Sequence, residues 1–151
     1  VVFDVEQLSI NGQQINSKSS HLMFIELPHL THIWRATKNC ILLQHLNRLL
    51  VVSCGNLKQV FPSSILKSLP QLRELHIEDC KELEEIIEEE DDQNVSNSYR
   101  ELVFPKLVTI CIKHCHKLKC VLPNISACRV IPNLRALYIE DAPALEQVFG
   151  R

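Results

Sequence analysis

Three cysteines and two histidines lie close together in one short stretch of the sequence. They are Cys111, His114, Cys115, His116 and Cys120. Thiolates and imidazoles are common ligands of zinc, so this density is typical of a metal site. The alternative is that the thiols fill structural positions, because a free cysteine packs like a small apolar side chain. The choice between the two depends on the pattern of the whole chain.

A second cluster is acidic. Of the 18 Asp and Glu residues, 11 lie between Glu74 and Asp92. Paired carboxylates can transfer protons or bind calcium. However, the run contains neither a D-x-D-x-D-G loop nor a glycine. We therefore interpret residues 88–100 as a solvated acidic loop insertion, and a docking patch for a basic partner is the alternative.

Several classes of function lack support. The motifs G-x-S-x-G, H-E-x-x-H and G-x-x-x-x-G-K-[ST] are all missing, so we predict no enzyme, no cofactor and no metal. The net charge is -2 and aromatic residues make up 5% of the chain, which argues against nucleic-acid binding. No apolar run approaches the roughly 20 residues of a membrane helix, so we expect no membrane contact.

A repeat explains where the cysteines stand. Six positions recur with the spacing L-x-x-L-x-I-x-x-C-x-x-L-x-x-I, and full copies begin at Leu46, Leu72, Leu107 and Leu134. We predict two weaker copies before them. One is contracted and uses Leu22, Ile25, Leu27, Leu30 and Ile33, and the other is a half copy over Val5, Leu8 and Ile10 that ends in a turn at Asn11-Gly12.

Repeats of about 20 to 29 residues with this spacing are typical of leucine-rich repeats. The alternating segment predicts a short strand, and parallel strands need a long crossover. We therefore predict an α/β solenoid, a leucine-rich-repeat horseshoe arc. It has a parallel β-sheet on the concave face and loops or short helices on the convex face. The helical turns are expected at Ser63–Leu69 and Ile125–Cys128, and Pro70, Pro105 and Pro132 are interpreted as strand starts.

The repeat favours the structural interpretation of the thiols. Cys54, Cys80 and Cys115 occupy one inward position, where a thiol can donate to turn carbonyls, whereas Cys111 should point outward. The seven cysteines are an odd number, which favours a reducing compartment and a cytoplasmic location. We expect residues 1–151 to form a single leucine-rich-repeat domain of about five to six repeats, cut from a longer protein.

Three segments resemble one family in particular: LRELHIEDCKELEEII (72–87), VFPKL (103–107) and QVFPSSI (59–65). They are similar to the leucine-rich repeats of plant intracellular nucleotide-binding disease-resistance proteins of the coiled-coil class. The resemblance implies a sensor and autoinhibitory region of a plant innate immune receptor. Its partner would be a pathogen effector, a guarded host protein or the adjacent nucleotide-binding domain. The alternatives are an F-box-type substrate adaptor and a free-standing protein inhibitor.

Outward strand positions predict the partner-binding face. Tyrosine and arginine dominate interface hot spots, so we expect Tyr138 and the arginines to be its anchors. The end repeats lack obvious polar caps, so copies of the chain can also associate edge to edge. The predicted partner-binding residues are Arg48, Leu50, Arg73, Glu74, His76, Glu78, Thr109, Cys111, Lys113, Arg135, Tyr138 and Glu140.

Overall fold

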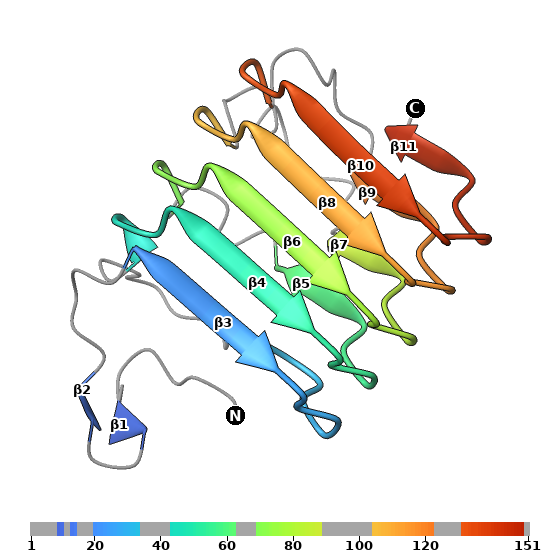
Figure 1. The fold of residues 1–151 in the computed structure, drawn as a ribbon, viewed down its shortest axis with the longest axis horizontal. Helices are drawn as coiled ribbons and strands as arrows, with labels where there is room; N and C mark the ends of the chain where they lie inside the picture. Colours follow the sequence, from blue (N-terminus) through green and yellow to red (C-terminus); the bar gives the residue numbers. More distant parts are fainter. Residues whose placement is uncertain are drawn as a thin grey trace, which may run out of the picture.

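The computed structural model describes residues 9–10, 13–14, 20–33, 43–62, 69–88, 104–122 and 131–149. Five long strands form one parallel sheet, and four short strands form a second parallel sheet behind it (Figure 1). The long strands are β3 (His21–Ile25), β4 (Arg48–Val52), β6 (Glu74–Glu78), β8 (Thr109–Lys113) and β10 (Ala136–Glu140). The short strands are β5 (Gln59–Phe61), β7 (Glu85–Ile87), β9 (Cys120–Leu122) and β11 (Gln147–Phe149). The predicted parallel solenoid is confirmed.

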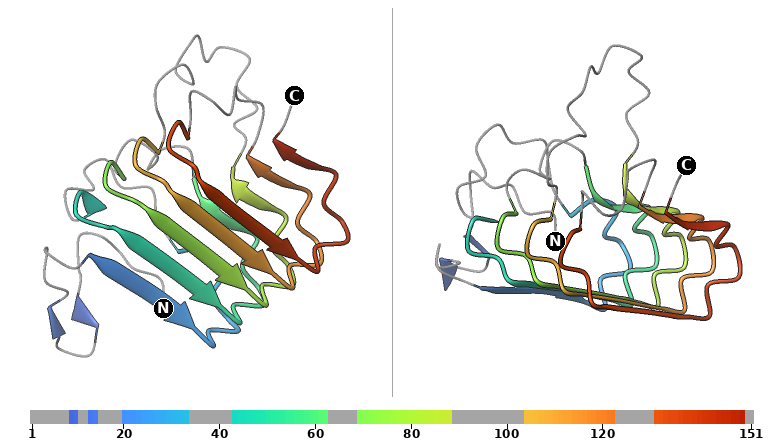
Figure 2. Two further views of the ribbon diagram at one scale, coloured as in Figure 1. Left: turned by 45° about the horizontal axis from the view of Figure 1, so that its top comes forward. Right: turned by 90° about the horizontal axis from the view of Figure 1, so that it is seen from above.

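The core lies between the two sheets. The right-hand view of Figure 2 shows the sheets edge-on, as two separate layers. The repeat positions account for the core. In β4, β6 and β8 every second side chain is buried, as period-two alternation requires. These inward side chains are at most 2% exposed and comprise Leu49, Val51, Leu75, Ile77, Ile110 and Ile112.

A tight turn follows each long strand. The first residue of the turn has a positive φ of 51 to 55° at Glu26, Ser53, Asp79, His114 and Asp141. Its N–H donates to the next strand along the stack, for example from Ser53 to the Glu78 carbonyl at 2.9 Å. In three copies the next residue is a buried cysteine. Its backbone carbonyl accepts a hydrogen bond from the N–H of the residue three positions later, for example from Leu83 to Cys80 at 3.2 Å. The inward position predicted for Cys54, Cys80 and Cys115 is confirmed, since all three are 0% exposed.

The prolines do not begin the strands. Pro70 lies in a β-turn closed by a bond from the Leu72 N–H to the Leu69 carbonyl, and β6 begins only at Glu74. A β-turn favours proline at its second position because the ring presets φ. The interpretation of these prolines as strand starts was therefore wrong.

The register predicted for the contracted copy was also wrong. Leu22 pairs with Leu49 and Phe24 with Val51, so Leu22 and Phe24 are the inward residues of β3. Ile25 pairs with Val52 and is 46% exposed. The copy is therefore displaced by three residues from the predicted one. Phe24 occupies a repeat position that is aliphatic in the other copies, so the sequence pattern did not reveal the correct alignment.

Of the half copy before it, the structure describes only Ile10. Ser9–Ile10 (β1) pairs antiparallel with Gln13–Gln14 (β2) in a separate small sheet. This is the pairing expected of a hairpin, whereas a repeat strand would run parallel to β3. Val5, Leu8 and Asn11-Gly12 lie outside the described residues, so the half copy as a whole stays a prediction.

The second sheet was not predicted. Loops or short helices were expected on that side, but its described residues form the strands β5, β7, β9 and β11. Two consecutive residues of each of the first three are buried, such as Val60 and Phe61. The helical turns predicted at Ser63–Leu69 and Ile125–Cys128 fall outside the described residues, apart from Leu69. In the part of the chain that the structure describes, no helix has the length and apolar character of a membrane span.

Candidate functional site

The outward face of the five-stranded sheet carries three rows of side chains. Each strand contributes one side chain to each row. Parallel pairing in register aligns them at the strand spacing of about 4.8 Å. The outward face of the sheet is therefore a regular array of side chains. The first row contains His21, Arg48, Glu74, Thr109 and Ala136, the second Met23, Leu50, His76, Cys111 and Tyr138, and the third Ile25, Val52, Glu78, Lys113 and Glu140.

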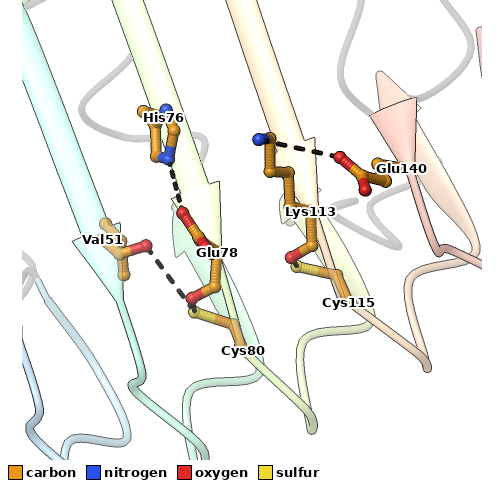
Figure 3. A network of polar contacts seen from close by, with 7 residues as sticks. All are labelled: Val51, His76, Glu78, Cys80, Lys113, Cys115 and Glu140. Carbon is orange, nitrogen blue, oxygen red and sulfur yellow. Dashed lines mark hydrogen bonds and ion pairs between the residues drawn. The ribbon is translucent and has the colours of Figure 1, made fainter. Parts of the chain in front are cut away.

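Polar contacts link neighbouring strands across this face. Arg48 Nε lies 2.6 Å from Glu74 Oε2, and Lys113 Nζ lies 3.6 Å from Glu140 Oε2. Within β6, His76 Nε2 lies 3.1 Å from Glu78 Oε2 (Figure 3). This hydrogen bond holds the pKa of the Glu78 carboxyl below its usual value. The pairs restrain side chains that would otherwise be mobile, and they lie at the surface, where each contributes little stability.

Tyr138 is the most prominent aromatic group of the face. It is the β10 residue of the second row, and its side chain is 61% exposed. A shallow depression of about 580 Å³ lies beside it, lined also by Cys111, Lys113 and Glu140. Cys111 is partly exposed and lies on the outward face, as predicted. An exposed ring beside a depression is the usual form of an interface anchor.

The face has an apolar end, of which the predicted site included only Leu50. Met23 is 61% and Ile25 is 46% exposed on β3, next to Leu50 and Val52 on β4. The wrong register of β3 placed Ile25 in the core and so concealed this patch. The alternation of Leu22 and Phe24 around Met23 was the signal that could have revealed it.

Two predicted residues lie away from the three rows. Arg73 and Arg135 precede β6 and β10 by one residue, at the start of the strands. There they line a pocket of about 350 Å³ with Lys106, Val108 and Asn133. The structure therefore brings ten of the twelve predicted residues together on the sheet face and places these two at its edge.

Described residues of the acidic run lie both on the sheet face and in contacts with the next repeat. Glu74 and Glu78 belong to the sheet face. Glu82 and Glu84 lie 2.7 and 3.0 Å from the amines of Lys117 and Lys119 in the next repeat. The loop insertion predicted at 88–100 falls outside the described residues after Glu88. Part of the run thus serves to join adjacent repeats.

The cysteines and histidines that suggested a metal do not converge. Cys115 faces the core, Cys111 faces the opposite side of the same sheet, and Cys120 lies on β9 in the second sheet. In the described residues, no group of three or more His, Cys, Asp and Glu could hold a metal ion. The thiol of Cys115 donates instead to the Lys113 carbonyl at 3.3 Å (Figure 3).

The two histidines share one carboxylate. His114 Nδ1 lies 3.0 Å and His116 Nε2 lies 2.9 Å from Asp141 Oδ2, which links the turns after β8 and β10. The hydrogen bond to Asp141 raises the pKa of His114, and the two imidazoles lower the pKa of Asp141. The cluster is therefore a pH-dependent contact between adjacent repeats.

Replacing Asp141 with Asn should lower the melting temperature most near pH 5. Because the pKa of His114 is raised in the folded state, its contribution is complete below about 6.5 and is lost as pH rises through the folded value. The lowered pKa of Asp141 makes its contribution complete above about 3.8. The difference between wild type and Asp141→Asn should therefore be largest near pH 5 and should shrink as the pH rises above about 6.5. Differential scanning fluorimetry over this range measures it.

Asp79→Asn is the matched control. Asp79 has the same left-handed conformation on the other side of His114, and its charge raises the pKa of His114 less than Asp141 does. In an NMR titration, the midpoint of His114 should fall clearly in Asp141→Asn and only slightly in Asp79→Asn. Equal shifts in the two variants would contradict the cluster.

Comparison with known proteins supports the repeat interpretation. Residues 1–81, more than half of the 151, match the family model described as "Plant disease resistance protein RPS2-like, leucine-rich repeats". Searches of curated proteins and of solved structures gave no significant match. The matched range ends at the turn after β6, and the same strand, turn and short strand continue through β11. This chain belongs to the leucine-rich repeats of RPS2-like plant disease resistance proteins.

Proposed function

We propose that the outward face of the five-stranded sheet binds a partner protein, and that the chain is the sensor and autoinhibitory repeat region of a plant innate immune receptor. The partner is a pathogen effector, a guarded host protein or an adjacent nucleotide-binding domain. The region contributes recognition rather than catalysis. The proposal includes a horseshoe arc with the sheet on its concave side.

The observation that carries this proposal is the pattern of exposure on the face. Exposed apolar and aromatic side chains stand at both ends of the middle row, where Met23 and Tyr138 are each 61% exposed. Between them lie restrained polar pairs such as Arg48 with Glu74. Exposed apolar groups framed by polar ones mark surfaces that bind other proteins. Membership of the resistance-protein repeats agrees with this use.

A cytoplasmic location is part of the proposal. Four cysteines in the described residues, Cys54, Cys80, Cys111 and Cys115, are free thiols. Free thiols, several of them buried, suit a reducing compartment.

Tyr138→Ala should weaken partner binding by about 30-fold or more, since hot-spot truncation costs about 2 kcal/mol or more. The first partners to test are the nucleotide-binding domain of the same receptor and a panel of effectors. Surface plasmon resonance measures the affinity of each. Binding that is unchanged in Tyr138→Ala and in Met23→Ala would overturn the assignment of this face.

Phe149→Ala is the control. Phe149 is also an exposed aromatic residue, at 38%, but it lies on β11 in the opposite sheet. It should leave the affinity unchanged. An F-box-type adaptor or a free-standing inhibitor would instead be indicated by binding to a ubiquitin-ligase subunit or to an enzyme, with the same face responsible.

A further inference from the structure

The pocket at the start of β6, β8 and β10 is strongly basic. Arg73, Lys106 and Arg135 line it, together with Val108 and Asn133, and the lining includes no carboxylate. Its volume of about 350 Å³ falls within the range of small-ligand sites. Three cations converging in one pocket repel each other unless an anion joins them.

The backbone ladder sets the spacing of the two arginines. The N–H of Val108 donates to the Arg73 carbonyl at 2.8 Å, and the N–H of Arg135 donates to the Val108 carbonyl at 2.9 Å. Arg73, Val108 and Arg135 are thus equivalent positions, each one residue before an adjacent strand. The two arginines stand two strand spacings apart, about 10 Å, with the short Val108 side chain between them. That gap leaves room for an anion that both guanidinium groups can contact.

The cations are available for such a ligand. In the described residues, neither Arg73 nor Arg135 forms an ion pair, and the neighbouring Glu74 is already bound by Arg48. Lys106 Nζ donates to Gln71 Oε1 at 2.7 Å, which positions the amine and leaves its other protons free. Asn133 is held by a bond of 2.6 Å to the Pro105 carbonyl. The residues around the two arginines are thus fixed, and the arginines are not engaged.

We propose that this pocket binds the phosphate group of a small ligand. Arginine matches phosphate in bidentate geometry, and three positive charges suit a group that carries two negative charges better than a single carboxylate. The site is separate from the outward face proposed to bind a protein. Soluble phosphates and lipid headgroups share this chemistry, and the test below distinguishes them.

The experiment measures binding of inorganic pyrophosphate to the full chain by calorimetry at constant ionic strength. Pyrophosphate should bind and should raise the melting temperature, whereas acetate at equal ionic strength should do neither. Arg73→Gln and Arg135→Gln should each weaken binding about tenfold or more. Lys117→Gln is the control, because Lys117 is also an exposed cation but pairs with Glu82 and does not line the pocket, so it should leave pyrophosphate binding unchanged.

Val108→Glu is a second test that does not depend on losing a charge. A carboxylate placed between the two arginines should occupy the anion position, raise the melting temperature and abolish pyrophosphate binding. Binding to vesicles that contain a phosphoinositide, without binding to pyrophosphate, would assign the phosphate to a lipid. Binding to neither probe, or equal losses in Lys117→Gln and Arg73→Gln, would overturn the proposal.

Discussion

Leu49→Ala should destabilise the protein by about 2 to 5 kcal/mol, the range for truncating a fully buried leucine. Leu49 is 0% exposed, and its neighbours across the sheet are Leu22 and Leu75. Removing its side chain leaves a cavity between rungs that the paired backbones cannot close. Urea denaturation followed by circular dichroism should show a lower midpoint with a similar slope.

Leu50→Ala is the control on the same strand. Leu50 is the same residue type one position later, and it lies on the outward face beside Met23 and His76. Because it is only partly buried, its loss should cost about 1 kcal/mol or less. Equal destabilisation by the two substitutions would show that the two faces of β4 are not distinct. That result would contradict the alternation on which both the core and the recognition face depend.

The second large effect concerns the reactivity of the thiols. Burial raises the pKa of the Cys80 thiol to about 12 from its ordinary 9.0. At pH 8 this change alone lowers the thiolate fraction by roughly 1000-fold, and the thiolate is the reactive form. Cys80 is also 0% exposed, so reagents cannot reach it. In native protein, iodoacetamide should modify Cys111 and leave Cys54, Cys80 and Cys115 unmodified.

Peptide mass spectrometry after a timed pulse of iodoacetamide measures these rates. The thiol of Cys80 donates to the Glu78 carbonyl at 3.5 Å and lies 4.0 Å from the Val51 carbonyl, so it joins two strands (Figure 3). In denaturant all seven cysteines should react at similar rates, which supplies the control. Equal labelling of Cys80 and Cys111 in native protein would mean that the repeat opens rapidly or that Cys80 is not inward.

From Leu46 onward, the sequence was sufficient to predict the part of the core that the repeat supplies. In the copies that begin at Leu46, Leu72 and Leu107 all six repeat positions are buried, and in the copy at Leu134 the leucine, isoleucine and valine positions are partly buried against the core. The prediction failed at β3 because Phe24 stands where other copies carry an aliphatic residue. It failed at β5 and β7 because a three-residue strand is too short to show a period. The repeat pattern in the sequence arises from side chains that are buried at regular positions. Segments without such a pattern cannot be recognised from it.

The candidate site was predicted less completely than the core. Alternation placed ten residues on the outward face, since inward and outward positions are determined together. Arg73 and Arg135 were assigned to the same face, but β6 and β10 begin one residue later than the template suggests. Their convergence with Lys106 depends on three adjacent turns. No single copy of the repeat contains that information.

The spacing of the long strands has a consequence for how such chains diversify. Their first residues are separated by 27, 26, 35 and 27 residues, yet every pair aligns with the same register. The additional length before Phe104 is therefore accommodated without slippage of β8 against β6. Loop length and the alignment of the array can thus vary independently. A foreign peptide grafted between Glu88 and Phe104 should therefore leave the three rows of outward side chains in the same spatial order.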